Sequence, residues 1–158
     1  MKNMLIQLFV LVIFVLISQA AGILGSFATI PNIDSWYATL IKPVLNPPNW
    51  IFGPVWTTLY TLMGIASYLV WRAKKGDWKL ALSIFFVHLI VNTAWSIVFF
   101  GEQNIGAALG IIILLDVLVI EVIRRFYKIS KIAGIILIPY LLWVLFATYL
   151  NGAIYFLN

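Results

Sequence analysis

The chain has 158 residues, of which 64% are hydrophobic and 9% charged, and its mean hydropathy is +1.08. Soluble domains carry about 25% charged residues, so this composition excludes a water-soluble globule and favours a protein solvated by lipid. The absence of cysteine excludes disulfides, thiolate metal sites and a cysteine nucleophile, and a single histidine cannot build a His-rich metal site. We therefore expect an all-α integral membrane bundle with no metal and no resident cofactor.

Five apolar stretches predict five transmembrane helices in a single domain over residues 1–158. Each stretch is close to or longer than the ~20 residues that a helix needs to cross the hydrocarbon core. Residues 28–51 contain four prolines, which disfavour a continuous helix, and are predicted to form the only long loop. The predicted spans are about 5–27, 52–71, 80–100, 105–123 and 132–156.

The basic residues are distributed unevenly between the two ends of such a bundle. Nine of the ten Lys and Arg side chains fall at the N-terminus, in residues 72–79 or in residues 124–131, and only Lys42 falls on the other side. The positive-inside rule then places the N-terminus in the cytoplasm, with the long loop and the C-terminus outside the cell membrane. Topology explains the net charge of +5, so we predict no nucleic-acid partner.

The first stretch permits a second interpretation, a cleaved secretory signal peptide that ends near Ser18-Gln19-Ala20. The apolar run continues past this site to Phe27 and gives a full span, so we favour a retained helix. Cleavage would leave four crossings and a mature N-terminus near Ala21.

Unusual residues form stripes on three predicted spans, all in the outer half of the bundle. Asparagine is costly against lipid and usually faces the bundle interior, so we expect these stripes to face inward. Two interpretations stay open from the pattern alone: the rings fill a packed core, or they line an aromatic cavity with a few polar groups. The stripes are Trp56, Tyr60 and Gly64; His88, Asn92, Trp95 and Ser96; and Trp143, Ala147 and Asn151.

Two carboxylates fall in the fourth span. Asp116 lies near its middle, where an unpaired charge is costly, so we expect this side chain to be protonated, paired or facing a wet cavity. A proton relay between Asp116 and His88 is one hypothesis. Glu121 precedes Arg124 and Arg125 by about one turn and is expected to pair with them.

Two further features predict how the helices pack. Gly106 and Gly110 form a GxxxG pair that permits close helix approach, and we favour a contact within the bundle over a dimer seam. Pro139 lies inside the fifth span just below Trp143, where it should kink the helix or remove one backbone hydrogen bond, and a kink there would open space in the outer half.

Three segments carry a recognisable order of residues. Ser35 to Ala66 reads SWYATLIKPVLNPPNWIFGPVWTTLYTLMGIA, Asn92 to Gly101 reads NTAWSIVFFG, and Pro139 to Asn151 reads PYLLWVLFATYLN. In this order they resemble the TspO/MBR family, the tryptophan-rich sensory proteins of bacteria and the related mitochondrial translocator protein or peripheral-type benzodiazepine receptor. The resemblance extends over nearly the whole chain.

The resemblance implies a five-helix membrane protein, commonly a homodimer, that binds porphyrins such as protoporphyrin IX and haem-like tetrapyrroles. It also implies binding of benzodiazepine- and isoquinoline-type ligands in a pocket at matching positions, which raises the cavity interpretation above the core-filling one. These positions are Tyr37, Trp56, Tyr60, Asn92, Trp95, Ser96, Trp143 and Ala147.

The chain departs from the family pattern at two places. Ile111 stands where family members often have an aspartate, so a role for that acidic residue is not carried over. No Lys or Arg follows Tyr155, so the cholesterol motif of the animal members is not predicted.

Three functions are compatible with these features. The leading hypothesis is a porphyrin receptor in which the loop with Trp36 and Lys42 forms a lid, and Lys42 is placed by its charge to meet a propionate. The second is light- and oxygen-dependent porphyrin degradation, with Trp56 and Trp143 as the candidate catalytic residues. The third is transport of a porphyrin or another small molecule, which the lack of an evident inverted repeat disfavours.

Overall fold

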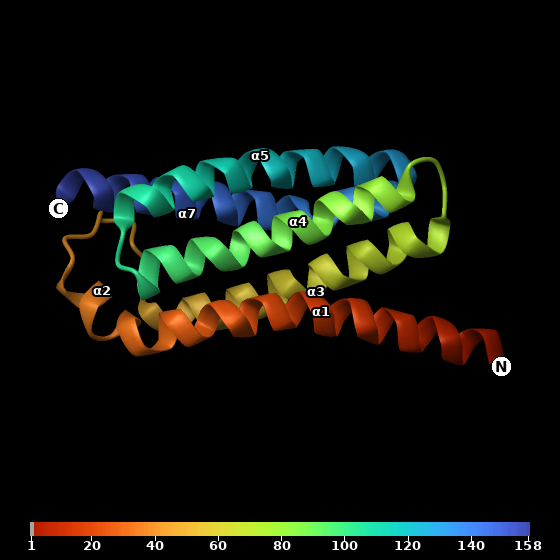
Figure 1. Cartoon of the computed structure of the whole chain (residues 1–158), viewed down its shortest axis with the longest axis horizontal. Coiled ribbons are helices and arrows are strands. Elements are labelled where there is room, and N and C mark those ends of the chain that lie inside the picture. The colour runs from red at the N-terminus through yellow and green to blue at the C-terminus, as the bar shows by residue number, and fades with distance from the viewer. Residues whose placement is uncertain (1) are drawn as a thin grey trace.

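The computed structural model describes residues 2–158, with side chains from Met4 onward. This part of the chain consists of helices and short connections, without a strand. The long helices lie side by side along one axis, and the N-terminus and C-terminus lie at opposite ends of the bundle (Figure 1). The elements are α1 (Lys2–Ile33), α2 (Trp36–Thr39), α3 (Asn49–Ala73), α4 (Trp78–Ser96), the π-helical turn η1 (Ile97–Gly101), α5 (Ile105–Ile129), α6 (Lys131–Ile135) and α7 (Ile138–Leu157).

Four helical segments are long and apolar enough to cross a membrane: Met4–Ile33, Trp78–Gly101, Ile105–Ile129 and Lys131–Leu157. Large apolar side chains on them, such as Leu16, Ile113 and Leu142, point outward and are exposed, as lipid-facing residues are. Helix α3 has 25 residues and packs along α1 and α4 in the same bundle. The predicted all-α, multi-pass membrane fold is therefore confirmed.

The loop predicted over residues 28–51 is much shorter in the structure, so that prediction is wrong at both ends. Helix α1 continues through Pro31, and α3 begins before residue 51. A proline removes one donor only, and side chains bond other carbonyls near the helix end. Asn32 Nδ2 donates to the carbonyl of residue 28 at 2.9 Å, and Ser35 Oγ donates to that of residue 31 at 2.8 Å.

The last predicted span is interrupted rather than kinked. Helix α6 ends at Ile135 and α7 begins at Ile138, so Pro139 stands in the first turn of α7. The N–H groups of a first turn have no partner within the helix, so a proline there costs no hydrogen bond. The prediction of a kink inside one continuous helix is wrong, and the break lies at residues 136–137.

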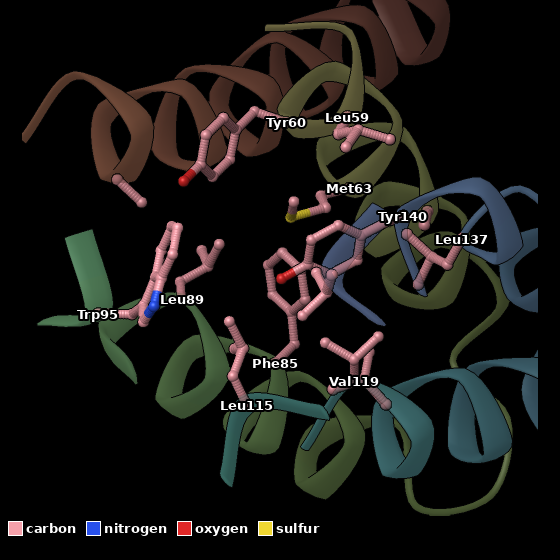
Figure 2. Close-up of a cluster of buried hydrophobic side chains, with 14 of the residues drawn as sticks. Leu59, Tyr60, Met63, Phe85, Leu89, Trp95, Leu115, Val119, Leu137 and Tyr140 are labelled. Carbon is pink, nitrogen blue, oxygen red and sulfur yellow. The ribbon is translucent and has the colours of Figure 1, made fainter. Parts of the chain in front are cut away.

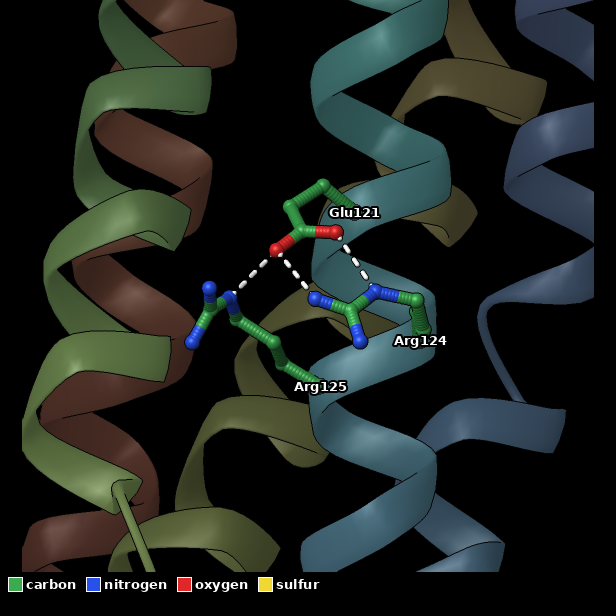
Figure 3. Close-up of polar contacts among 3 residues, drawn as sticks. All are labelled: Glu121, Arg124 and Arg125. Atoms are coloured by element: carbon green, nitrogen blue, oxygen red, sulfur yellow. Dashed lines mark hydrogen bonds and ion pairs between the residues drawn. The ribbon is translucent and has the colours of Figure 1, made fainter.

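Helix α5 extends six residues beyond the predicted end at residue 123 and carries a charged cluster there. Figure 3 shows Glu121 between Arg124 and Arg125. Arg124 donates to both carboxylate oxygens, each at 2.7 Å, and Arg125 Nε donates to Oε1 at 2.5 Å. The predicted pairing is confirmed, and it lets the helix continue with its charges satisfied among themselves.

The core is built from aromatic and aliphatic side chains of α3, α4, α5 and α7, which meet at the centre of the bundle (Figure 2). Phe85, Met63, Leu115 and Tyr140 are almost fully buried there. Each fully buried side chain of this kind contributes roughly 1.5–3 kcal/mol in water, but in lipid dense packing supplies much of the stabilisation.

Gly64 and Gly106 are two of the glycines at which helices pack closely. A Cβ on Gly64 of α3 would lie 2.5 Å from the Val15 Cα of α1, so only glycine permits this approach. In the GxxxG pair, a Cβ on Gly106 would lie 3.0 Å from the Tyr155 ring of α7, whereas one on Gly110 would meet no described atom within 4 Å. The predicted contact within the bundle is therefore made by Gly106.

Candidate ligand-binding site

A cavity of about 430 Å³ lies at the end of the bundle where α2 packs. It is lined by the second half of α1, the first half of α3, and the ends of α4 and α7. Tyr37 of α2 completes the lining. Its lining is mostly apolar with a few polar groups, and its volume is within the ~300–1,000 Å³ range of small-molecule sites. Most of the stripe residues therefore line a cavity, which favours the cavity interpretation over the core-filling one.

Most of the predicted pocket residues meet at this cavity. Seven of the eight positions line it, and Trp143 does not. The two predicted lid residues, Trp36 and Lys42, are also outside the lining. The seven residues are Tyr37, Trp56, Tyr60, Asn92, Trp95, Ser96 and Ala147.

Trp143 lies one turn before Ala147 on α7 and packs among aromatic side chains instead. Its ring meets Phe52 edge-on at 6.1 Å between centroids and Phe146 at 5.7 Å. Its indole N–H is buried, with no hydrogen-bond partner among residues 2–158. Trp143 therefore contacts the lining residue Phe52 without lining the cavity itself.

The short helix α2 and the loop after it are held by contacts with η1 and by hydrogen bonds within the loop. Trp36 meets Phe99 edge-on, with centroids 5.6 Å apart. Lys42 Nζ donates to the carbonyls of residues 38 and 40 and lies 4.9 Å from the centroid of the Tyr37 ring. The ammonium group therefore braces the loop and is not part of the cavity wall.

Tyr37 anchors this loop to η1, because its ring meets Phe99 at 6.1 Å and Phe100 at 5.5 Å between centroids. It is 3% exposed, and its hydroxyl donates to Asn46 Oδ1 at 2.6 Å. Burial raises the pKa of Tyr37 to about 12, and the bond to Asn46 opposes this shift. The hydroxyl therefore stays protonated and bonded across the physiological pH range.

Helix α1 supplies a wall that the sequence reasoning missed. Gln19, Gly22, Gly25, Ser26 and Thr29 line the cavity. Small and polar residues recur every three or four positions along this otherwise apolar helix, which puts them on one face. That spacing is visible in the sequence and could have identified the wall.

An aromatic cluster forms one side of the cavity around Trp56. Its ring stacks on Tyr60 with centroids 5.6 Å apart and planes at 30°, and it approaches Trp95 at 6.4 Å. It also meets Tyr140 edge-on at 6.3 Å, beyond the cavity wall. This arrangement offers broad π faces to a flat ligand.

A pair of buried hydrogen bonds links α4, α5 and α7 at the cavity. Trp95 Nε1 donates to Asn151 Oδ1 at 3.0 Å, and Asn151 Nδ2 donates to the Ile105 carbonyl at 3.0 Å. Asn151 is 1% exposed, so both bonds are shielded from solvent. They hold the indole of Trp95 against the cavity.

Four buried side chains form a continuous hydrogen-bonded chain that begins at the cavity wall. Tyr60 Oη is 2.5 Å from Asn92 Oδ1, and Asn92 Nδ2 is 2.9 Å from Tyr140 Oη. Tyr140 Oη is 2.6 Å from His88 Nε2, and His88 Nδ1 is 3.0 Å from the Phe85 carbonyl oxygen. Tyr60 and Asn92 line the cavity, whereas Tyr140 and His88 lie behind it. The chain thus ties α3, α4 and α7 together.

The predicted relay between His88 and Asp116 is wrong, because each bonds to a different residue. His88 bonds within the chain just described, and Asp116 Oδ2 accepts from Thr148 Oγ1 at 2.9 Å. Asp116 Oδ1 is buried and has no hydrogen-bond partner in the described part of the chain. No group of three or more His, Asp and Glu side chains within residues 2–158 is arranged to hold a metal ion.

Comparison with known proteins relates this architecture to one family. A family model described as the TspO/MBR family matches residues 14–157. The tryptophan-rich protein TspO of Archaeoglobus fulgidus is 48% identical over 150 residues, covering 94% of this chain and 96% of that protein. The tryptophan-rich protein TspO of Chlorobaculum tepidum is 41% identical over 155 residues, with coverages of 96% and 98%. The translocator protein of Homo sapiens is 40% identical over 123 residues, with coverages of 76% and 73%.

Proposed function

We propose that this chain, which belongs to the TspO/MBR family, is a membrane receptor that binds flat aromatic ligands, above all porphyrins such as protoporphyrin IX, in the cavity behind α2. Benzodiazepine- and isoquinoline-type molecules belong to the same class of ligand. The observation that carries the proposal is the cavity itself, because seven predicted positions from four helical elements converge on it. The broad faces of Trp56 and Trp95 suit a large π system, and Asn92 with Tyr60 supplies polar contacts.

The proposal includes five membrane crossings and a defined orientation. Helix α3 is the fifth span: at 1.5 Å per residue its 25 residues are long enough to cross ~30 Å of hydrocarbon. An odd number of crossings agrees with termini at opposite ends of the bundle (Figure 1). The N-terminus is then cytoplasmic by the positive-inside rule, and the cavity opens in the outer half. The homodimer implied by the family resemblance stays a prediction.

The propionates of a bound porphyrin would lie toward the loop that carries Lys42, outside the apolar lining. Lys42 bonds to loop carbonyls, so meeting a propionate requires its ammonium group to change partners. Charge reversal by Lys42→Glu is expected to weaken binding of the diacid more than binding of its dimethyl ester. Equal weakening of the diacid and its ester would show that Lys42 does not recognise the propionates.

Titration with protoporphyrin IX in the dark, followed by tryptophan quenching in nanodiscs, tests the receptor. Ala147→Phe places a ring in the lined space, and Leu145→Phe makes a comparable change on the same helix at a side chain that is 44% exposed. We expect saturable quenching in the wild type and in Leu145→Phe, and much weaker quenching in Ala147→Phe. Saturable quenching that is equal in all three proteins would place binding elsewhere.

Light-dependent porphyrin degradation is a second candidate function, favoured by the contacts of Trp56 with Tyr60, Trp95 and the cavity. The bound porphyrin would act as photosensitiser and dioxygen as oxidant, and an adjacent indole would donate an electron. Trp56→Phe should slow loss of the porphyrin absorbance band under light while binding persists. Because Trp143 lies outside the lining, Trp143→Phe should have a smaller effect, and normal degradation in both variants would refute the catalytic assignment.

A further inference from the structure

The hydrogen-bonded chain behind the cavity has a direction, and His88 determines it. A backbone carbonyl only accepts, so the contact with the Phe85 oxygen requires a hydrogen on His88 Nδ1. His88 is fully buried and bonds to no carboxylate, so its ring is neutral in this apolar setting and Nε2 is an acceptor. The hydroxyl of Tyr140 must then donate to Nε2.

The remaining links follow one by one from that bond. Because the single hydrogen of the Tyr140 hydroxyl is engaged with His88, its oxygen can only accept from Asn92. Asn92 therefore turns its Nδ2 to Tyr140 and its Oδ1 to Tyr60, whose hydroxyl donates to it. With its single hydrogen donated to Asn92, Tyr60 Oη retains only lone pairs for a further partner.

Other donors around the cavity are engaged in the same way. Both hydrogens of the Gln19 amide nitrogen go to residues of α3, at 2.9 Å each. The Tyr37 hydroxyl donates to Asn46, and the indole N–H of Trp95 donates to Asn151. Ser96 Oγ donates to the Gly25 carbonyl at 3.1 Å. The oxygen atoms of these side chains therefore offer lone pairs to a ligand, whereas the indole N–H of Trp56 on the same lining bonds to no described residue and stays a donor.

We propose that the polar wall at Tyr60 accepts hydrogen bonds from the ligand, and that His88, which does not touch the cavity, is the positioning residue that imposes this polarity. At the Tyr60 wall the cavity then favours flat apolar ligands that place an N–H or O–H donor there over isosteric ligands that place an acceptor there. A free-base tetrapyrrole, with its pyrrole N–H groups, belongs to the favoured class. The inference goes beyond the receptor proposal because it concerns any ligand of this chemistry.

Substitution at His88 should reverse the chain. In His88→Leu the Tyr140 hydroxyl loses its acceptor, and a buried O–H without an acceptor is unfavourable. A flip of the Asn92 amide restores the bonds among the three remaining side chains: Oδ1 accepts from Tyr140, Nδ2 donates to Tyr60, and the Tyr60 hydroxyl is free to donate elsewhere. In His88→Gln the side-chain amide can donate to the Phe85 carbonyl and accept from Tyr140, so the original direction is retained.

The test compares carbazole, a flat tricycle with an N–H donor, with fluorenone, a tricycle of similar shape with a carbonyl acceptor. Their saturable uptake by proteoliposomes is measured against protein-free liposomes of the same lipid. We expect a preference for carbazole in the wild type and in His88→Gln. In His88→Leu the affinity ratio should shift toward fluorenone by roughly tenfold, as expected for one exchanged hydrogen bond.

A second measurement needs no ligand and separates polarity from folding. The vibrational signature of Tyr60, isolated as the Raman difference between each protein and the same protein with Tyr60→Phe, reports whether the hydroxyl donates or accepts. It should change from donor to acceptor in His88→Leu and stay unchanged in His88→Gln. An unaltered ligand ratio, or an unaltered Tyr60 signature in His88→Leu, would overturn the inference. Failure of the porphyrin titration alone would overturn only the receptor proposal.

Discussion

Gly22 of α1 packs against the ring of Tyr60, so a substitution there affects both the packing of α1 and the shape of the cavity. A Cβ at this position would overlap the Tyr60 ring, with Cδ2 at 2.6 Å and Cζ at 3.1 Å. The ring is held on its other side by Trp56, and its hydroxyl is held by Asn92 at 2.5 Å. Gly22→Ala is therefore predicted to force a change at Tyr60 or to move α1.

Both responses are unfavourable by a similar amount. If the ring swings away, the hydrogen bond to Asn92 is lost, and an unsatisfied buried group costs about 1–3 kcal/mol. If α1 shifts, overpacking costs about 1–3 kcal/mol. The higher helix propensity of alanine returns about 0.5–1 kcal/mol. We therefore expect Gly22→Ala to lower the free energy of unfolding by up to roughly 2.5 kcal/mol.

Unfolding by increasing mole fraction of sodium dodecyl sulfate in mixed micelles, followed by tryptophan fluorescence, measures this change. Gly110→Ala is the matched control, because a Cβ there meets open space among the described residues and should be neutral or slightly stabilising. Protoporphyrin IX affinity should fall in Gly22→Ala and not in Gly110→Ala. If the two variants unfold at the same detergent fraction and bind equally, the packing argument for α1 against Tyr60 is refuted.

Three further predictions concern other contacts. Gly64→Ala should destabilise the bundle by about 1–3 kcal/mol in the same assay, because its Cβ meets the Val15 backbone, which cannot rotate away; a midpoint equal to that of Gly110→Ala would contradict this. Asn151→Ala should lower the free energy of unfolding by about 1–3 kcal/mol, because it leaves the Trp95 N–H without its acceptor. Adding Trp95→Phe to this variant should recover part of that loss. If the effects of the two substitutions are simply additive, this explanation is excluded. Since burial raises the pKa of Tyr37 from 10.0 to about 12, its proton is bound more tightly in the folded state, and stability that is full below pH 10 should fall between about pH 10 and 12. Tyr37→Phe should remove this fall in the free energy of unfolding with pH, and an identical pH dependence in both proteins would disprove the prediction.

The membrane fold and most of the lining could be predicted from the sequence because both depend on local periodicity. Apolar runs of sufficient length identify four of the helical segments without reference to any neighbour. Trp56 and Tyr60 recur at helical spacing in one span, as do His88 and Asn92 in another, and the cost of asparagine in lipid indicates which face turns inward. Chain order within a family motif then supplied Tyr37, which periodicity alone does not reach.

The remaining features depend on contacts between distant segments. Pro31 does not end α1, because side chains from residues 32 and 35 bond carbonyls at the helix end. Trp143 matches the motif yet packs on Phe52, and only the relative rotation of α3 and α7 decides that. The partner of His88 is Tyr140, 52 residues away, so no spacing rule could have preferred it over Asp116.

The polar chain has a particular meaning in a protein solvated by lipid. In water, a reversed or broken link could be repaired by solvent, and the direction of the chain would be a weak constraint. In the core of this bundle Asn92, Tyr140 and His88 are at most 2% exposed, so each donor depends on one protein partner. The Phe85 carbonyl fixes the position of the hydrogen on His88, and this position therefore sets the direction of the hydrogen bonds through Tyr140 and Asn92 to Tyr60. No bond is lost at any of these steps. The chemistry that a ligand meets at the cavity wall is decided by a histidine that the ligand never touches.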